Sequence, residues 1–211
     1  MELDRWIPIY EDIIEDLGYS KDEDEEAAEL LAKIRGSDPI KPLEKMRGKT
    51  VEIQGPFIEE PTGNIHISAG AAVSRSVDIG SPIDILVTDL DGDTELQIRK
   101  NLDGAVAVIH AHGDNIELIE RYAERFRGHV ISTCQCEPPK IYADNIYNFG
   151  GFTDGDRAVY LADHFGAEEI ILNGWDLDKP AEKGSDPFIK QKKLSWAERL
   201  IQKIETPVVQ L

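Results

Sequence analysis

From residue 49 onward, short β-rich runs alternate with amphipathic helical stretches. This alternation is typical of a parallel sheet, because parallel strands need long crossover connections and helices usually supply them. The sequence predicts strands at residues 50–54, 65–68, 83–88, 105–110, 129–133, 145–149, 168–172 and 207–210, and helices at 71–77, 94–101, 115–127, 154–165 and 189–204. We therefore predict an α/β fold with a mostly parallel sheet flanked by helices.

The first 48 residues show a different pattern. Apolar residues recur at helical spacing over residues 6–17 and again over 27–34, which predicts two helices. We interpret the charged run at 21–26 as the solvated first turn of the second helix, where carboxylates also suit the helix dipole. We divide the chain into an N-terminal helical segment, residues 1–48, and an α/β catalytic domain, residues 49–211.

The charge composition limits the partners of the protein. The chain has 41 acidic and 23 basic residues, a formal net charge of −18. Such a surface disfavours nucleic acid and anionic membranes, and a phosphate-binding protein of this kind needs metal ions or a few well-placed cations. The N-terminus lacks the features of a signal peptide, no apolar run approaches the roughly 20 residues of a membrane span, and two cysteines fit a reducing compartment. We expect a cytoplasmic protein.

Two carboxylates follow the predicted strand at 83–88, in the sequence Asp89-Leu90-Asp91-Gly92. Residues two apart in extended geometry point to the same side, so Asp89 and Asp91 should converge. Their repulsion requires a counter-charge, which a hard cation such as Mg²⁺ supplies. Open α/β sheets also bind ligands at the carboxyl ends of their strands. We therefore predict that Asp89 and Asp91 are metal ligands.

A second polar loop, His110-Ala111-His112-Gly113-Asp114-Asn115, follows the strand at 105–110. Asp114 or Asn115 can be a simple helix cap. Two histidines, a glycine and a carboxylate exceed what a cap requires. We predict that His112 contacts a phosphate and that Asp114 adds a carboxylate to the metal site.

The richest loop is Gly150-Gly151-Phe152-Thr153-Asp154-Gly155-Asp156-Arg157, between a predicted strand and a predicted helix. The paired glycines permit backbone conformations closed to other residues. A cap at Thr153 or Asp154 with an acidic first turn explains Asp154 and Asp156. It does not explain Arg157, because a cation in the first turn opposes the helix dipole. A bound phosphate accounts for that arginine.

Three further segments have weaker signals. Asn173 and Asp176 follow the strand at 168–172 and can hydrogen-bond a heterocycle on which Trp175 packs, or they can form a structural turn. The small residues of Ser68-Ala69-Gly70-Ala71-Ala72 suit a phosphate at a helix N-terminus or a plain tight turn. Asp178 to Pro187, with its prolines and glycine, is predicted to be a mobile loop and a candidate lid.

Other readings fit part of the pattern. His110-x-His112 with Cys134-x-Cys136 can make a zinc site, but Cys-x-Cys lacks the usual two-residue spacer, which favours small buried cysteines. Asp89 to Thr94 nearly reproduces the Asp-x-Asp-Gly-Thr motif of haloacid-dehalogenase-type phosphatases, with Asp89 as nucleophile, except that Asp93 intrudes. A non-catalytic nucleotide-binding module has no need of so many carboxylates at strand ends.

In their order and spacing, the three polar loops resemble the archaeal 6-hydroxymethyl-7,8-dihydropterin pyrophosphokinase family. The resemblance extends from about residue 50 to the C-terminus, although the family's first glycine-rich turn, often Gly-x-Gly-Pro-Ser, is here Ser68-Ala69-Gly70-Ala71-Ala72. The Asp-x-Asp loop and the later Thr-Asp also resemble the metal-binding carboxylates of thiamine pyrophosphokinase.

The resemblance implies Mg²⁺-dependent transfer of diphosphate from ATP to the hydroxymethyl group of a reduced pterin, with AMP as the other product, on the way to folate or tetrahydromethanopterin. Thiamine is the alternative acceptor, and a homodimer is possible. The predicted catalytic residues are Asp89, Asp91, Asp154 and Arg157; the nucleotide-binding residues are His112, Gly113, Asn115, Gly150, Gly151 and Thr153; the acceptor-binding residues are Asn173 and Asp176; and the metal ligands are Asp89, Asp91, Asp114 and Asp156.

Overall fold

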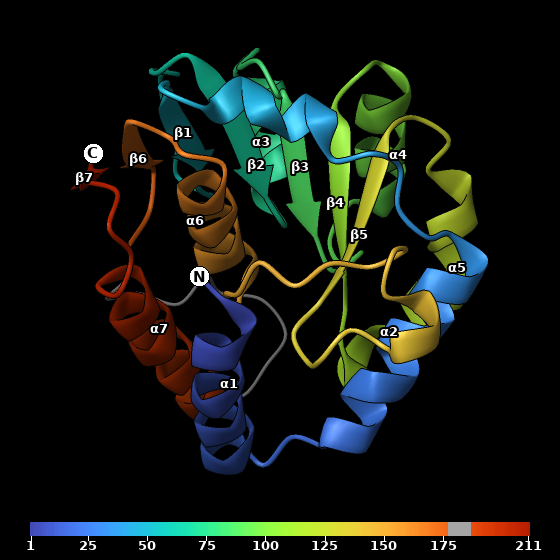
Figure 1. The fold of residues 1–211 in the computed structure, drawn as a ribbon. Helices are drawn as coiled ribbons and strands as arrows, with labels where there is room; N and C mark the ends of the chain where they lie inside the picture. The colour runs from blue at the N-terminus through green and yellow to red at the C-terminus, as the bar shows by residue number, and fades with distance from the viewer. Residues whose placement is uncertain (177–186) are drawn as a thin grey trace.

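Seven strands form one sheet in the order β5-β4-β3-β2-β1-β6-β7 in the computed structural model, which describes residues 1–176 and 187–211 (Figure 1). The strands are β1 (Thr50–Gln54), β2 (Ile65–Ala69), β3 (Ile85–Thr88), β4 (Val106–Ala111), β5 (Val130–Cys134), β6 (Glu169–Asn173) and β7 (Val208–Gln210). Each neighbouring pair is parallel. The predicted α/β fold is confirmed.

The central strands are buried on both faces, so apolar and polar residues do not alternate along them. All residues of β3 and β4 are buried. Parallel sheets have this pattern because crossover helices cover both faces. The edge strand β7, by contrast, is short and largely exposed.

The helices agree with the predicted ones to within a few residues. They are α1 (Leu3–Leu17), α2 (Lys21–Ile34), α3 (Ala72–Asp78), α4 (Thr94–Leu102), α5 (Ile116–Tyr122), α6 (Asp154–His164) and α7 (Pro187–Ile201), with short 3₁₀ helices η1 (Lys41–Met46), η2 (Gly113–Asn115), η3 (Ala123–Arg125) and η4 (Lys140–Tyr142). Within the described ranges, no helix is both long and apolar enough to cross a membrane. The predicted lid at 178–187 lies outside the described residues, apart from Pro187, which begins α7.

One predicted strand, 145–149, is wrong. Tyr147 makes a single bridge to Thr133 at the edge of β5, and no ladder follows. Immediately afterwards the Asn148 amide turns away and donates to the carbonyls of Gln135 and Cys136. The segment is therefore a loop that lies against β5 and leads to the glycine pair before α6.

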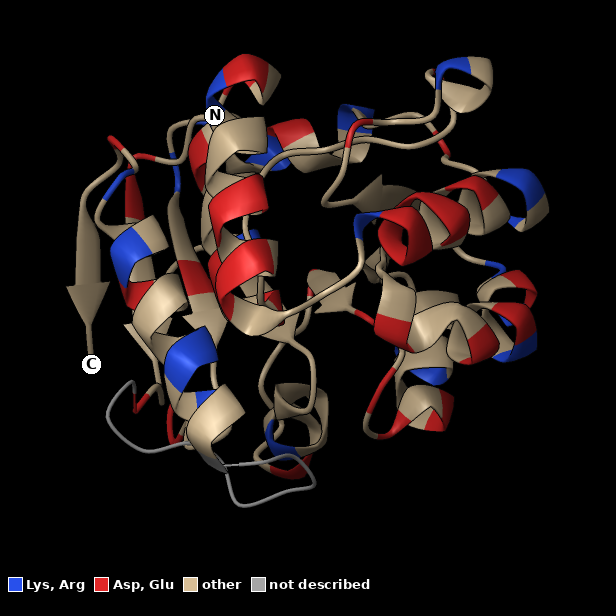
Figure 2. Ribbon diagram, turned by 90° about the horizontal axis from the view of Figure 1, so that it is seen from below, with Lys and Arg blue, Asp and Glu red and all other residues tan. Residues whose placement is uncertain are grey.

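The helices α1 and α2 lie beyond the carboxyl ends of the strands (Figure 1). Their apolar side chains, including Trp6, Tyr10 and Leu31, share one buried cluster with Ile109 of β4 and Tyr160 of α6. Viewed from below, acidic residues recur along both helices (Figure 2). The N-terminal helices thus bury one side against the α/β core and present carboxylates on the other.

The interpretation of residues 21–26 as a fully solvated first turn is wrong at one position. Asp24 is only 3% exposed, whereas Glu23 and Glu25 on either side of it are exposed. Asp24 shares the inward face of α2 with Ala27 and Ala28, three and four residues later. The helix therefore carries one of its carboxylates into the interior.

At the opposite, amino-terminal end of the sheet, Asp84 joins β2 to β3. Its Oδ2 accepts from the backbone N of His66 at 3.0 Å and lies 3.3 Å from His66 Nδ1, and Lys45 Nζ lies 3.2 Å from its Oδ1. The hydrogen bond from His66 lowers the pKa of Asp84 far below its ordinary value, and the same hydrogen bond raises the pKa of His66.

We expect Asp84→Asn to cost about 1 kcal/mol of unfolding free energy near pH 5.5, a small value because the site is partly solvated. Because the pKa of Asp84 is lowered by folding, its contribution to stability is present above its unfolded pKa of about 4 and is lost as the solution is acidified. Because the pKa of His66 is raised by folding, its contribution is present below its unfolded pKa of about 6.5 and is lost as the pH rises through its folded pKa. Urea unfolding at pH 3, 5.5 and 8 should show the largest difference from wild type at pH 5.5. A difference independent of pH would contradict this account.

Candidate active site

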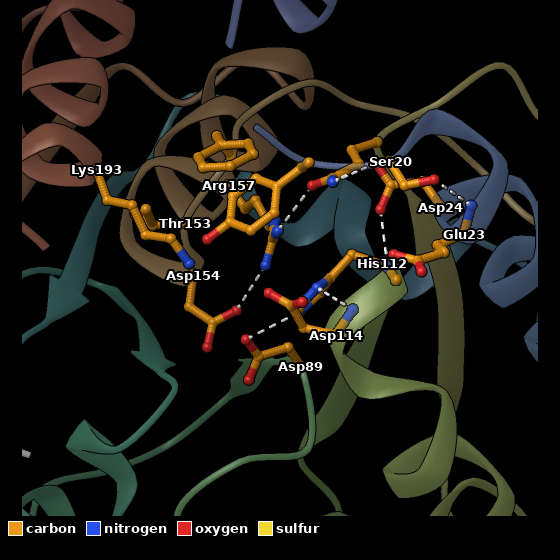
Figure 3. A pocket seen from close by; sticks show the side chains of 14 residues that line it. Ser20, Glu23, Asp24, Asp89, His112, Asp114, Thr153, Asp154, Arg157 and Lys193 are labelled. Atoms are coloured by element: carbon orange, nitrogen blue, oxygen red, sulfur yellow. Dashed lines mark hydrogen bonds and ion pairs between the residues drawn. The ribbon is translucent and has the colours of Figure 1, made fainter. Parts of the chain in front are cut away.

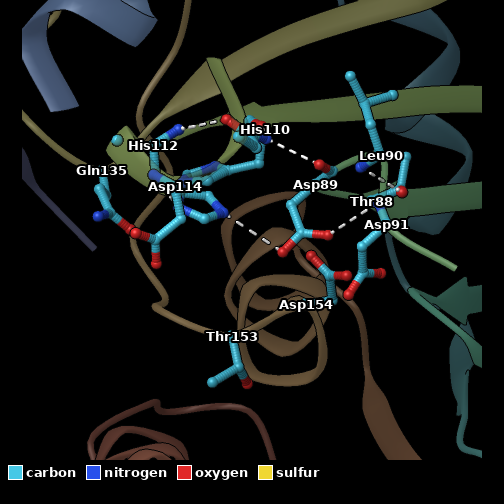
Figure 4. Close-up of polar contacts among 12 residues, drawn as sticks. Thr88, Asp89, Leu90, Asp91, His110, His112, Asp114, Gln135, Thr153 and Asp154 are labelled. Carbon is cyan, nitrogen blue, oxygen red and sulfur yellow. Dashed lines mark hydrogen bonds and ion pairs between the residues drawn. The ribbon is translucent and has the colours of Figure 1, made fainter. Parts of the chain in front are cut away.

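Three carboxylates converge beyond the carboxyl end of β3. Asp89 and Asp91 lie on the loop that follows β3, and Asp154 is the first residue of α6 (Figure 4). One oxygen of each lies within 4.8 Å of the others. In the part of the chain that the structure describes, this is the one group of three or more His, Cys, Asp or Glu side chains placed to share a metal ion.

A left-handed turn at Leu90 makes the two loop aspartates converge. Leu90 has a φ of 71°, and its side chain is fully buried. Thr88 Oγ1 accepts from Leu90 N at 2.9 Å, and Asp91 N donates to Asp89 Oδ1 at 3.3 Å. The left-handed conformation costs about 1–2 kcal/mol, which burial of the leucine side chain offsets. The aspartates converge as predicted, but a buried turn residue, and not an extended strand, brings them together.

Asp154 reaches the cluster because Gly70 leaves room for it. Gly70 has a φ of +53°, and a Cβ at this position would lie 2.5 Å from Asp154 Oδ2. The sequence left the turn at 68–72 open between phosphate binding and a plain tight turn. The structure shows that its glycine accommodates a carboxylate.

Asp156, predicted as a metal ligand, caps α6 instead of joining the cluster. It is 1% exposed, its Oδ1 accepts from Thr153 N at 2.8 Å, and its Oδ2 accepts from Phe152 N. These bonds fix the loop that presents Asp154. Asp114, also predicted as a ligand, lies exposed on the wall of the adjacent pocket and outside the group of three.

The three carboxylates have different proton affinities. Burial alone would raise the pKa of Asp89, but the hydrogen bond from His112 and the charge of Arg157 lower it below its ordinary value. Burial and the charge of Asp89 raise the pKa of Asp91 to about 6. Burial and the charge of Asp89 also raise the pKa of Asp154 well above its usual range. The cluster therefore holds protons that a cation would displace.

Two side chains of basic type flank the cluster. Arg157 is 7% exposed and donates from Nη1 to Asp154 Oδ1 at 3.1 Å. His112 Nε2 lies 3.4 Å from Asp89 Oδ2, while its Nδ1 accepts from the backbone N of Asp114. A neutral imidazole that accepts at Nδ1 carries its proton on Nε2, so His112 donates to Asp89. Both side chains were predicted from the sequence, and both contact the carboxylates directly.

A pocket of about 220 Å³ opens beside the cluster (Figure 3). Its walls come from the turn between α1 and α2, from α2, from the loops after β3, β4 and β5, and from α6 and α7. The lining residues are Tyr19, Ser20, Glu23, Asp24, Asp89, His112, Gly113, Asp114, Gln135, Phe152, Thr153, Asp154, Arg157 and Lys193. Lys193 Nζ lies 5.2 Å from the Tyr19 ring centroid and 5.9 Å from that of Phe152. The pocket therefore combines carboxylates, cations and two aromatic rings.

The predicted nucleotide-binding residues divide into two groups. His112, Gly113 and Thr153 line the pocket. Asn115 is buried and ties the loops together by donating to the carbonyls of Asp89 and His110. The glycine pair lies behind the pocket, at φ values of +86° and +87°, where side chains would collide with Tyr160 and with the backbone of Arg157.

The predicted acceptor-binding residues lie elsewhere. Asn173 Nδ2 donates to buried Glu52 and to the carbonyl of Glu60. Asp176 lines a separate groove that includes Phe57 and Gln210. Trp175 packs over Gly155 and donates to the carbonyl of Ile53. This segment braces β1 and β6 and does not line the pocket beside the carboxylates.

The histidine–cysteine pairs do not form a zinc site among the described residues. His112 donates to Asp89, and His110 Nδ1 lies 3.0 Å from Thr133 Oγ1. Cys134 Sγ donates to the carbonyl of Cys136, and Cys136 Sγ donates to that of Asp24. The hydrogen bond with Cys136 and burial raise the pKa of Cys134, and neither cysteine belongs to the group of side chains placed to share a metal ion.

Sequence reasoning missed seven pocket residues: Tyr19, Ser20, Glu23, Asp24, Gln135, Phe152 and Lys193. The aromatic and basic ones lie on segments that meet the site only through tertiary packing. Asp24 alone gave a usable signal, because it is spaced three and four residues before the inward-facing Ala27 and Ala28.

We expect Gly70→Ala to weaken binding of a divalent cation, because the added methyl group displaces Asp154. Gly80→Ala is the matched control: it has a similar φ of +70°, with nothing within 4 Å of the added Cβ. Each variant should lose about 1–2 kcal/mol of stability from left-handed strain. Calorimetric Mn²⁺ titration and thermal unfolding separate the two effects. Equal metal affinity in the two variants would refute the role of Gly70.

Comparison with known proteins agrees with this geometry and confirms the resemblance. The 6-hydroxymethyl-7,8-dihydropterin pyrophosphokinase of Methanocaldococcus jannaschii is 35% identical over 99% of the chain and 98% of the relative. The protein of the same name from Pyrococcus furiosus is 37% identical over 95% of the chain and 89% of the relative. The one from Methanothermobacter thermautotrophicus is 34% identical over 97% of the chain and 96% of the relative. The family model matches residues 55–182, so the chain belongs to the 6-hydroxymethylpterin diphosphokinase MptE-like family.

Proposed function

We propose that the protein transfers a diphosphate group from ATP to the hydroxyl group of 6-hydroxymethyl-7,8-dihydropterin and releases AMP, as a step towards folate or tetrahydromethanopterin. The observation that carries the proposal is the convergence of Asp89, Asp91 and Asp154 beside Arg157 at the mouth of a pocket. The printed names of three relatives, each similar over almost the whole chain, supply the substrate.

The carboxylate cluster fits Mg²⁺ in chemical type. Mg²⁺ prefers hard oxygen ligands, and the cluster offers an oxygen from each of three aspartates. Burial and the charge of Asp89 raise the pKa values of Asp91 and Asp154 although Arg157 lies beside them, so the cluster can accept further positive charge. We propose that these three residues hold Mg²⁺, which when bound neutralises charge on the transferred phosphates.

The residues of the chain position the reactants and stabilise charge. The pterin hydroxyl attacks the β-phosphorus, the bond from that phosphorus to the oxygen bridging to the α-phosphate breaks, and a pocket carboxylate takes the hydroxyl proton. Arg157 and Lys193 line the pocket and offer cations to the phosphates. Tyr19 and Phe152 offer ring faces to a flat heterocycle. Such a reaction depends on in-line alignment and needs no covalent intermediate.

Three other activities would each give a different result in a single assay. A thiamine pyrophosphokinase uses the same chemistry with another acceptor. A haloacid-dehalogenase-type phosphatase would form an aspartyl phosphate on Asp89. A nucleotide-binding module would show no turnover.

The assay mixes the protein with ATP, Mg²⁺ and either 6-hydroxymethyl-7,8-dihydropterin or thiamine. We expect AMP and the pterin diphosphate, with no AMP in the thiamine reaction. ADP, inorganic phosphate or a trapped phospho-enzyme as the product would overturn the proposal.

Asp89→Asn and Asp91→Asn should each lower kcat by at least about 100-fold, because they remove charge that holds the metal. Their thermal unfolding should stay near the wild-type temperature, since each change relieves repulsion. Asp93→Asn is the matched control: Asp93 lies on the same loop and its side chain caps α4 by accepting from Leu96 N. It should remain active. Near-normal activity of either cluster variant would refute the metal assignment.

Metal affinity should fall as the pH drops below about 6, by up to about tenfold per unit, because metal ligands must be deprotonated. The pKa of Asp91 is raised to about 6 and that of Asp154 also rises, so protons compete with the cation. Calorimetry at pH 5, 6 and 7.5, in buffers of different ionisation enthalpy, measures the affinity and counts the protons released. A constant affinity over this range would show that the cation binds elsewhere.

A further inference from the structure

The buried carboxylate of Asp24 takes no part in the chemistry described above. It lies on α2, before the start of the family match at residue 55. Its Oδ1 accepts from Gly113 N at 2.8 Å, and its Oδ2 accepts from Tyr10 Oη at 2.7 Å and from Gln135 Nε2 at 2.8 Å. Within the described ranges no Lys or Arg forms an ion pair with it. A buried carboxylate without a cationic partner depends on its hydrogen bonds for stability, and these three bonds link α2 to α1 and to the loops after β4 and β5.

One of these bonds fixes the orientation of an amide. An ionised carboxylate only accepts hydrogen bonds, so Gln135 must turn its NH₂ towards Asp24 and its carbonyl away. The Gln135 carbonyl Oε1 then accepts from Arg157 Nη2 at 3.2 Å. The other end of the same guanidinium donates to Asp154 at 3.1 Å. A chain of hydrogen bonds therefore links Asp24 through Gln135 to Arg157.

A second bond fixes the loop after β4. Gly113 follows His112, whose imidazole donates to Asp89. A Cβ on Gly113 would lie 2.7 Å from Glu23 Cβ, so α2 packs directly against this turn. Through the Gly113 amide, the same carboxylate holds the backbone that carries His112 (Figure 3).

We propose that Asp24 is a positioning residue of the active site: it orients Arg157 through Gln135 and His112 through Gly113, and so sets both basic side chains that flank the metal-binding aspartates. The catalytic part of this proposal rests on the proposed function. Without the Gln135 carbonyl, Arg157 would be free to form a two-bond pair with a cluster carboxylate, which competes with the cation.

Asp24→Asn tests the proposal because it keeps the shape and reverses one hydrogen bond. The new NH₂ group faces Gln135, the glutamine amide turns over, and its NH₂ then opposes Arg157. We expect kcat to fall about 100-fold, the loss typical of a misplaced catalytic group, with a smaller change in KM for ATP. Gln135→Met removes the link without touching Asp24 and should lose a similar factor, so it carries the test if D24N does not fold.

The double variant D24N/Q135E restores the link in reverse, because the carboxylate introduced by Q135E accepts both from the NH₂ group introduced by D24N and from Arg157. It should recover most of the lost kcat. Tyr10→Phe is the matched control: it removes a hydrogen bond from Asp24 and lowers the unfolding temperature, but leaves Gln135 in place, so kcat should stay within about twofold of wild type.

A readout independent of turnover is the Arg157 Nε–H signal in the ¹⁵N–¹H spectrum, identified by its loss in R157K. It should shift in D24N and Q135M and return in D24N/Q135E. Wild-type kcat in folded D24N and Q135M, a double variant no better than D24N, or an unmoved Arg157 signal would overturn the positioning role. A wild-type protein that makes no AMP would overturn only the proposed function, since the spectra still test the link.

Discussion

Mutual repulsion of three carboxylates is the constraint on which the rest of the site depends. Two unit charges about 4 Å apart repel by about 4 kcal/mol at an effective dielectric constant of 20. The oxygens of Asp89, Asp91 and Asp154 lie within 4.8 Å of one another, so the fold must hold them together at a cost. Buried Leu90 fixes the first loop, and Gly70 leaves space for the carboxylate at the start of α6.

The N-terminal helices complete this arrangement. Although the sequence pattern separates residues 1–48 from the α/β alternation, α1 and α2 share a buried cluster with β4 and α6. The turn between them contributes Tyr19 to the pocket, and α2 contributes Asp24. The loop after β3 and the start of α6 carry the three carboxylates. The N-terminal helical segment supplies part of the pocket wall, and its Asp24 hydrogen-bonds the segments that hold Arg157 and His112.

The sequence was sufficient for the fold and for the convergence of Asp89 and Asp91, but it placed Asp114 and Asp156 among the metal ligands where the structure has Asp154. The alternation of apolar runs and amphipathic stretches predicts the parallel sheet, because parallel strands need long crossover connections and helices supply them. Asp89 and Asp91 were predictable because they follow β3, and the carboxyl ends of parallel strands share one edge. Asp154 and Arg157 were singled out by the paired glycines and the helix start that follow the run at 145–149, although that run is a loop against β5 and not a strand. The strand predicted at 145–149 failed because apolar content alone does not reveal that Asn148 breaks the ladder.

The rest of the site depends on contacts between distant segments. Nothing in the order of residues shows that Asp24 hydrogen-bonds Gln135, 111 positions later, or that Lys193 lies over the rings of Tyr19 and Phe152. The sequence left ambiguous, for a different reason, whether Asp154 or Asp156 joins the carboxylate cluster. Both lie in the first turn of α6, and only the three-dimensional path of the loop decides which one caps the helix and which one faces the cluster.

The most direct test of the central claim is anomalous diffraction from crystals grown with Mn²⁺, which replaces Mg²⁺ at oxygen sites. We predict a peak among the carboxylate oxygens of Asp89, Asp91 and Asp154. A peak elsewhere in the pocket, such as beside Asp114 or Glu23, or no peak at saturating Mn²⁺, would contradict the account.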